Sequence, residues 1–170
     1  DNAGQAVAKN RGIQASTGDF VAFLDADDAW EPNKLELQLP LFSQPEVGVT
    51  FTMMDFMDED GRRMPYTVTD LSRPRRGNVS RELFVDNFVP FSASMVRKEC
   101  FARAGMMDTS LRMAIDWDLW LRMSVHYSFD FVDQPLLLYR TGHAGQMSRN
   151  YFVRAKDQMT IMTRFVSQNP

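Results

Sequence analysis

Three carboxylates stand within four residues, Asp25-Ala26-Asp27-Asp28, directly after the apolar run at residues 20–24. Like charges this close repel each other, and partial burial strengthens the repulsion, so such a cluster needs a cation nearby. Carboxylate oxygens suit Mg²⁺ or Mn²⁺, ions that keep several waters and take further ligands from a substrate diphosphate. The cluster therefore predicts a site for a metal-bridged phosphate ester. The structural alternative is that Asp27 and Asp28 cap the next helix.

The elements around this cluster predict how it is held. Small apolar residues between 3 and 15 indicate a helix, and the continuous apolar run at 20–24 indicates a short, buried parallel strand. Pro32 suits the first turn of a second helix, and Pro40 is expected to kink or end it. The apolar positions of that second helix are Leu35, Leu39 and Phe42. This order puts the acidic cluster at the carboxyl end of a central strand, where open α/β sheets bind ligands.

The rest of the chain continues to alternate between the two kinds of element, which predicts an α/β fold. The residues 58–61 form a hairpin-type turn, and the polar stretch 62–77 is expected to be a loop. We expect the last helix to place Met159, Met162 and Phe165 on one side. Hydrophobic spacing predicts strands at 46–54, 91–96, 129–132 and 136–139, and helices at 80–87, 98–104, 115–126 and 151–166.

Composition excludes several classes of protein. The 170 residues carry a net charge of −3, which gives no global field to hold a polyanion, so we expect no nucleic-acid partner. The single cysteine, Cys100, excludes an internal disulfide. No apolar run approaches the roughly 18 residues that a membrane span needs, and no secretory signal is visible. Arg73, Arg75 and Arg76 are expected in a solvated loop, with contact to an anionic acceptor or a lipid surface as the alternative.

A set of short motifs in fixed order links the acidic cluster to a known family. They are Asn2-Ala3-Gly4, Ala8-Lys9-Asn10, Gly12-Ile13, Gly18-Asp19-Phe20, Phe23-Leu24-Asp25-Ala26-Asp27-Asp28, Ala104 to Asp108, Asp116 to Arg122, and Tyr139-Arg140 with His143. Together they resemble the family 2 glycosyltransferases of GT-A fold. Lys9 departs from the usual arginine, Ile115 stands where the family often has glutamate, and His143 lies one residue farther from Arg140 than usual.

The resemblance implies a GT-A-like mixed sheet flanked by helices, in a single domain over residues 1–170. Because the family's first strand–helix units have no counterpart before Asp1, we expect an N-terminally truncated domain, roughly its C-terminal two-thirds. The implied activity is metal-dependent, inverting transfer of a sugar from a nucleotide-sugar donor to a glycan or lipid-linked acceptor in cell-surface polysaccharide synthesis. The implied location is the cytoplasm, with peripheral contact at the inner membrane surface. A sheet edge exposed by truncation would also favour self-association.

The same resemblance assigns the donor side of the site. It makes Asp27 and His143 ligands of Mn²⁺ or Mg²⁺, and a surface histidine is the alternative for His143. Asp25 would face the ribose or a metal-bound water. Lys9 and Arg140 would bind the nucleotide sugar, and a structural ion pair is the alternative for Arg140.

Asp116 is the expected general base, because it opens the helix at 115–126 and can project into a cleft. A positioned carboxylate that accepts the proton of the attacking hydroxyl contributes about 10²- to 10⁴-fold to such a step. A helix-capping aspartate is the alternative. Asp118 is the weaker candidate, and Trp117 and Trp120 are expected to lie in the core.

Two other interpretations of the chain remain. One is a non-catalytic remnant or interaction module of the same fold. The other is a haloacid-dehalogenase-like phosphohydrolase, which also carries D-x-D after an apolar strand. That family has Thr or Val where this chain has Ala29, which makes this interpretation the weaker of the two.

Overall fold

The computed structural model describes residues 3–64, 73–142 and 151–169. Five strands form one mixed sheet in the order β1-β4-β3-β5-β2, in which β3 and β5 are parallel and the other pairs are antiparallel. The strands are β1 Phe20–Ala22, β2 Ala29–Trp30, β3 Val47–Met57, β4 Met95–Arg97 and β5 Ser128–Arg140. The α/β fold and the mixed sheet flanked by helices are therefore confirmed.

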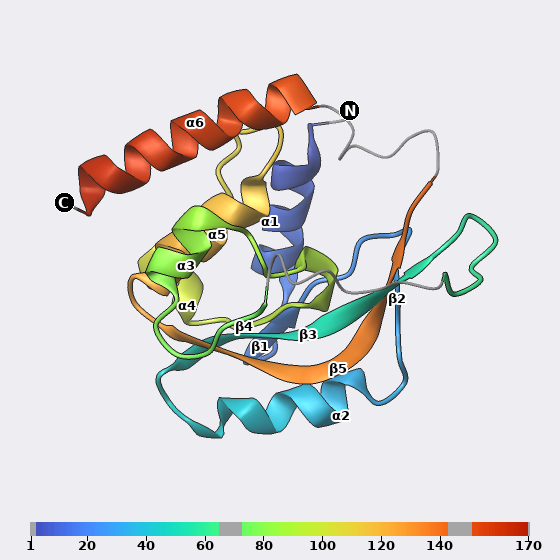
Figure 1. Cartoon of the computed structure of the whole chain (residues 1–170). Helices are drawn as coiled ribbons and strands as arrows, with labels where there is room; N and C mark the ends of the chain where they lie inside the picture. The colour runs from blue at the N-terminus through green and yellow to red at the C-terminus, as the bar shows by residue number, and fades with distance from the viewer. Residues whose placement is uncertain (1–2, 65–72, 143–150, 170) are drawn as a thin grey trace.

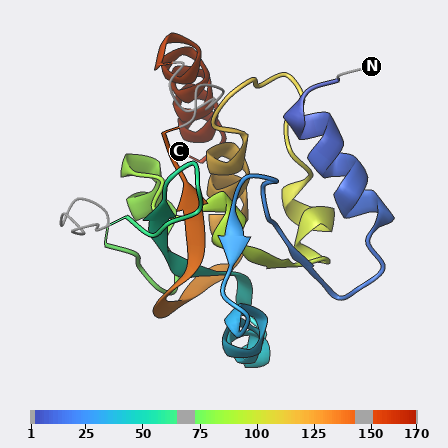
Figure 2. The ribbon, with the colours of Figure 1, turned by 90° about the vertical axis from the view of Figure 1, so that its right-hand side faces the viewer.

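Helices cover both faces of the sheet. In Figure 1, α2 lies below the sheet, whereas α3 and α5 lie above it with α6 beyond them, and the turned view in Figure 2 agrees. The helices are α1 Gln5–Ala15, α2 Lys34–Gln38, α3 Ser80–Val85, α4 Cys100–Ala104, α5 Ile115–Ser124 and α6 Tyr151–Gln168, with the 3-10 turns η1 Leu39–Ser43 and η3 Phe91–Ala93. The main core lies between the sheet and the upper helices, around Trp120, Phe51 and Phe129.

Several boundaries agree with the local sequence signals. The α-helix α2 ends where Pro40 enters, and the chain continues as the 3-10 turn η1. Helix α4 ends at Gly105, whose φ of 76° is the left-handed conformation that glycine adopts most easily. The predicted turn after β3 is present: the amide of Gly61 donates to the carbonyl of Asp58, and Met64 pairs back to Phe56.

The strand before the acidic cluster differs from its prediction. We expected a buried parallel strand at residues 20–24, but β1 is three residues long and pairs antiparallel with β4. Among the described residues, β1 has β4 alone as a neighbour, and Leu24 is 44% exposed. A continuous apolar run fits a buried strand and an edge strand equally well, so the run could not fix the pairing.

Two further strand predictions were wrong in extent. The segments 129–132 and 136–139 belong to one strand, β5, whose register against β3 shifts near Pro135. Such irregularities let a strand continue past a proline that cannot donate a ladder hydrogen bond. The predicted strand at 91–96 begins instead as the 3-10 turn η3, and only Met95–Arg97 form β4.

Helix α2 turns its polar side to the protein. Leu35 and Leu39, predicted to be core positions, are about half exposed, whereas Lys34 and Gln38 are fully buried. The Lys34 ammonium donates to Oε1 of Gln38 at 2.7 Å and lies 4.2 Å from the centroid of the Trp30 ring. Gln38 in turn donates to Thr50, and burial lowers the pKa of Lys34 to about 7. Polar contacts to β2 and β3 therefore replace the apolar contacts predicted for Leu35 and Leu39, whereas Phe42 is buried as predicted.

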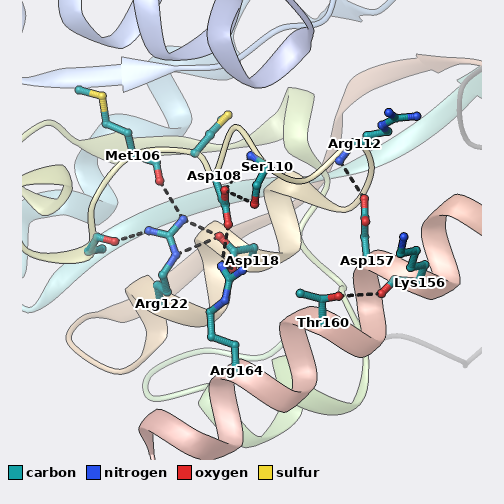
Figure 3. Close-up of polar contacts among 12 residues, drawn as sticks. Met106, Asp108, Ser110, Arg112, Asp118, Arg122, Lys156, Asp157, Thr160 and Arg164 are labelled. Atoms are coloured by element: carbon teal, nitrogen blue, oxygen red, sulfur yellow. Dashed lines mark hydrogen bonds and ion pairs between the residues drawn. The ribbon is translucent and has the colours of Figure 1, made fainter.

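Helix α6 also shows a different face from the one predicted. Met159 is 71% exposed and Met162 38% exposed, whereas Asp157 and Ile161 are buried and Phe165 packs against the core. The Asp157 carboxylate accepts a hydrogen bond from the amide of Arg112 at 2.8 Å (Figure 3) and a second from the amide of Met113 at 2.7 Å. A buried carboxylate thus fixes α6 against the loop that leads into α5.

Candidate active site

The acidic loop, residues 25–28, connects β1 to β2 and is held from below by η3. The amide of Asp25 donates to Oγ of Ser92 at 3.1 Å, and the indole of Trp30 donates to the Ser92 carbonyl at 2.6 Å. The loop closes on itself through a bond from the Asp28 amide to the Asp25 carbonyl. Ser92 of η3 therefore holds the first residue of the loop and the tryptophan of β2 that follows it, so η3 helps to position the loop.

Asp25 forms an ion pair with Lys9 of α1. The Lys9 ammonium lies 3.0 Å from Oδ1 of Asp25 and 3.7 Å from the centroid of the Phe91 ring. The Lys9 side chain is 18% exposed and that of Asp25 42% exposed, so the pair is open to solvent on the carboxylate side. Two of the residues predicted to bind the nucleotide sugar are therefore in contact.

Asp28 holds the loop in place. Its Oδ1 accepts the amide of Arg140 at 3.0 Å, while its Oδ2 is buried and has no hydrogen-bond partner among the described residues. Burial raises the pKa of Asp28, the bonds from Ser92 and Arg140 lower it, and the charges of Asp27 and Asp25 raise it again. The net pKa is raised, mainly because the Asp28 carboxylate is partly buried.

The Arg140 side chain ties the acidic loop to the turn after β3. Its Nε donates to the carbonyl of Asp27 at 2.9 Å, and its Nη1 donates to the carbonyls of Asp58 and Glu59 at 2.9 and 2.7 Å. These partners are backbone oxygens, so the contacts position Asp27 without neutralising its carboxylate. Asp27 itself is exposed at the tip of the loop, and His143, the other predicted metal ligand, lies outside the described residues.

Asp116, the predicted base, lies in α5. It occupies the first turn of the helix, but the N-cap is Ala114 (φ 52°, left-handed), and no side chain caps the helix. The capping alternative for Asp116 is therefore not what the structure contains. The Asp116 carboxylate instead accepts a hydrogen bond from Nδ2 of Asn87 at 3.0 Å. The amide of Asn87 therefore orients the partly exposed carboxylate of Asp116.

A cavity of about 260 Å³ brings these groups together. Lys9 and Asp25 line it together with Asn87 and Asp116, although Asp25 and Asp116 are 91 positions apart in the chain. The cavity is further lined by Ser92, Met113, Tyr139 and Arg154. Asp27 and Arg140 do not line it and stand at the acidic loop beside it.

Three residues of this site were not predicted from the sequence, namely Ser92, Asn87 and Arg154. Ser92 lay in a segment predicted as a strand, and Asn87 at the end of a predicted helix, so neither belonged to a motif. Arg154 lay on a helix whose apolar face was misjudged. No local signal in the sequence identifies any of the three, because the burial of Asp157, which fixes the side of α6 that carries Arg154, is known only from the structure.

The second aspartate of α5 is structural. Asp118 is 3% exposed and receives Nε and Nη2 of Arg122 at 3.0 and 2.6 Å (Figure 3). Arg164 of α6 lies 3.8 Å from Asp118 and donates to Asp108 at 2.6 Å. Trp117 and Trp120 are buried, as predicted. Asp118 therefore joins α5 to α6 and does not reach the cavity.

The pair Asp108–Arg164 makes a testable contribution to stability. Burial raises the pKa of Asp108, but hydrogen bonds from Arg164 and Ser110 outweigh it and lower the pKa to about 2. Because the folded-state pKa lies below the ordinary value, the stabilisation is present above pH 4 and is lost as the pH falls towards 2. We expect Asp108→Asn to lower the free energy of unfolding by about 1–2 kcal/mol at pH 7 and by little near pH 2.

Urea unfolding of both proteins at a series of pH values measures this difference. The matched control is Asp133→Asn, an exposed carboxylate in β5, which should change stability little at any pH. A difference between wild type and Asp108→Asn that stays constant from pH 7 to pH 2 would contradict the assignment.

The remaining charged candidates lie away from the cavity. Arg76 donates to Asp130 and to the carbonyl of Phe131, and its guanidinium lies 3.9 Å from the centroid of the Phe131 ring. It is therefore paired on β5 and not a free cation of a solvated loop. Within the described ranges, no three histidine, cysteine, aspartate or glutamate side chains gather as a metal site, and no helix there is long and apolar enough to cross a membrane.

Solved structures share this fold, which is that of the GT-A glycosyltransferases. S. aureus TarS in complex with UDP-GlcNAc superposes with a TM-score of 0.66 at 14% identity, over 96% of this chain and 52% of that one. The mannosyltransferase PcManGT from Pyrobaculum calidifontis, in complex with GDP-Man and Mn²⁺, gives 0.64 at 16% identity, over 98% and 44%.

The chain belongs to glycosyl transferase family 2, whose model matches residues 1–105. It is 34% identical to the O-antigen biosynthesis protein RfbC of Myxococcus xanthus, over 84% of this chain and 11% of RfbC. It is 41% identical to the putative teichuronic acid biosynthesis glycosyltransferase TuaG of Bacillus subtilis, over 36% of this chain and 24% of TuaG. The chain spans about half the length of the uncharacterized glycosyltransferase MJ1057 of Methanocaldococcus jannaschii, to which it is 25% identical.

Proposed function

We propose that this protein is a glycosyltransferase that moves a sugar from a nucleotide-sugar donor to a hydroxyl group of an acceptor. The observation that carries the proposal is the cavity that Asp116 and its partner Asn87 line together with Asp25 of the acidic loop. Such an arrangement offers a proton acceptor on one side of a reacting carbon and a place for the leaving diphosphate on the other. Family membership and the solved complexes of two GT-A enzymes with nucleotide sugars support it.

Asp116 is the proposed general base. The acceptor oxygen attacks the anomeric carbon, its proton passes to the Asp116 carboxylate, and the bond from that carbon to the diphosphate oxygen breaks with its electron pair leaving on the diphosphate. Besides Asp25 of the acidic loop, Asp116 is the one carboxylate that lines the described part of the cavity, so a single displacement with inversion fits better than two displacements through two carboxylates. The Asn87 amide holds the Asp116 carboxylate in place.

A divalent ion fits the donor chemistry of the acidic loop. Asp27 is exposed at the tip, Asp25 is open to solvent, and hard oxygen ligands of this kind suit Mn²⁺ or Mg²⁺. Two protein carboxylates suffice where waters and the diphosphate complete the coordination. Asp27, with His143, would hold the ion, which would supply Lewis-acid neutralisation of the charge on the leaving diphosphate.

The basic residues of the site have separate proposed tasks. Lys9 sets the position of Asp25 through their ion pair and presents its remaining donors to the nucleotide sugar. Arg140 acts on the donor by positioning Asp27 and Asp28 through its bonds to the loop. These assignments keep both residues on the donor side and make Arg140 a positioning residue.

The proposed setting is assembly of a cell-surface polysaccharide or lipid-linked glycan, on the cytoplasmic side and in peripheral contact with the inner membrane. The names of RfbC and TuaG, which refer to O-antigen and teichuronic acid biosynthesis, support this setting. We also propose that residues 1–170 belong to one domain and that the edge of β1, which has no strand beside it among the described residues, is a surface for association with a second copy.

Metal removal tests the proposed chemistry. The release of nucleoside diphosphate from UDP-GlcNAc and GDP-Man is measured with the complete protein in Mn²⁺ and then in EDTA. We expect turnover to fall to background in EDTA and to return when Mn²⁺ is added back. Turnover that is equal in both conditions would contradict metal dependence, and binding of neither donor would favour a non-catalytic module of the same fold.

A further inference from the structure

Arg154 of α6 stands where the cavity meets a second hollow. The second hollow has a volume of about 250 Å³ and shares Asn87, Ala114, Asp116 and Arg154 with the cavity. Its remaining walls are Val85, Asp86, Trp117 and Gln158. Lys9 and Asp25 do not line it, so the second hollow lies on the side of Asp116 away from the acidic loop.

Helix α6 is docked by contacts that fix the position of Arg154. The carboxylate of Asp157, one turn farther along, accepts hydrogen bonds from two backbone amides of the loop before α5. Ile161 is 2% exposed, and Arg164 pairs with Asp108. Residues 154, 157, 161 and 164 fall on one side of a helix because they are three or four positions apart. Arg154 is therefore the first position of the docked side, where α6 passes over the two hollows.

The guanidinium of Arg154 has no partner in the described part of the chain. It is partly buried, and neither Asp86 nor Asp116, the carboxylates beside it, forms an ion pair with it. Each of the other partly buried arginines there donates to a carboxylate or a carbonyl oxygen, namely Arg97, Arg122, Arg140 and Arg164. Removing a guanidinium from water without a partner costs free energy, which a ligand anion would offset.

We propose that Arg154 binds an oxyanionic substituent, a phosphate or a carboxylate, of the acceptor. This inference rests on the proposed function and adds the substrate class of its acceptor side. An acceptor in the second hollow would bring its hydroxyl to Asp116, which lines both spaces. Its anionic group would meet the planar fork of Arg154, and Asn87 and Gln158 would hydrogen-bond its other hydroxyls.

The charge distribution favours the acceptor over the donor as the source of this anion. In the proposed function, the acidic loop would bind the donor diphosphate through its divalent ion, and Lys9 is paired with Asp25 of that loop. Arg154 stands across the cavity next to the proposed base. An arginine that paired directly with Asp116 would weaken it as a proton acceptor, whereas an arginine engaged by the acceptor brings the nucleophile to the base without that cost.

The test compares three sugar probes in EDTA, so that no metal ion can bind phosphate at the acidic loop. Calorimetry measures binding of α-D-glucose 1-phosphate, D-glucuronate and methyl α-D-glucoside to the complete protein. We expect both anionic probes to bind at least about tenfold more tightly than the neutral one. Arg154→Gln should remove that preference, and Arg154→Lys should keep part of it because the charge remains without the fork.

Arg112→Gln is the matched control, because the Arg112 side chain is exposed and only its backbone amide binds Asp157. It should leave all three affinities unchanged. No preference for the anionic probes in the wild type, or a preference that survives Arg154→Gln, would overturn the inference.

A preference for one anion alone would identify it as phosphate or carboxylate. Binding of UDP with Mn²⁺, measured separately, tests the proposed function. If UDP does not bind, the proposed transferase activity is contradicted, whereas anion binding at Arg154 is not.

Discussion

Replacement of Asp116 by asparagine is expected to lower turnover by about 10²- to 10⁴-fold. Asparagine keeps the size of the side chain but cannot accept the proton of the attacking hydroxyl. Because Asp116 lies across the cavity from Asp25 and Lys9, donor binding should change little. Steady-state kinetics with UDP-GlcNAc or GDP-Man, together with calorimetry of the matching nucleoside diphosphate, separate the two effects.

Two variants make the result specific to Asp116. Asp133→Asn removes an exposed carboxylate of β5 that does not line the cavity, and its turnover should equal that of the wild type. Asn87→Ala removes the amide that orients Asp116 and should lower turnover by less than Asp116→Asn does. Near-normal turnover of Asp116→Asn would exclude Asp116 as the base.

Trp120→Ala is expected to lower the free energy of unfolding by about 3–5 kcal/mol. Trp120 is fully buried, and its ring lies 6.3 to 6.5 Å from the ring centroids of Phe23, Phe91 and Phe129. It thereby joins α5 to the segment between β1 and the acidic loop, to η3 and to β5. Chemical denaturation at neutral pH measures the loss, and the fraction of folded protein should fall as well.

A smaller change at the same position distinguishes packing from hydrogen bonding. The indole nitrogen of Trp120 is buried and has no hydrogen-bond partner among the described residues. Trp120→Phe therefore removes volume without breaking a hydrogen bond and should cost clearly less than Trp120→Ala. If Trp120→Phe and Trp120→Ala lose equal stability, the packing of an aromatic ring does not explain how Trp120 stabilises the fold.

The acidic loop and its family could be predicted because the chemistry is local in sequence. Three carboxylates in four residues after an apolar run predict a loop without any information on tertiary contacts. The base candidate could be predicted for the same reason, since Asp116 begins a helix with strong periodic signals. Its orientation by Asn87 could not, because that contact joins residues 29 positions apart that share no motif.

The errors arise where tertiary contacts override local patterns. Leu35 and Leu39 were expected in the core from helical spacing, but Lys34 and Gln38 are buried because Thr50 and Trp30 offer partners from other elements. In the same way, Asp157 turns α6 by capturing two amides of a distant loop. A polar side chain is buried when its partners are present, and single-sequence periodicity contains no information on those partners.

The central claim is that the acidic loop binds a divalent ion together with a nucleoside diphosphate. Calorimetric titration of the complete protein with UDP and with GDP, each with and without Mn²⁺, tests it most directly. We predict binding of at least one nucleotide that depends on Mn²⁺ and is lost when Asp25 and Asp27 are both replaced by asparagine. Binding of neither nucleotide, or Mn²⁺-dependent binding that persists in the double variant, would contradict the account.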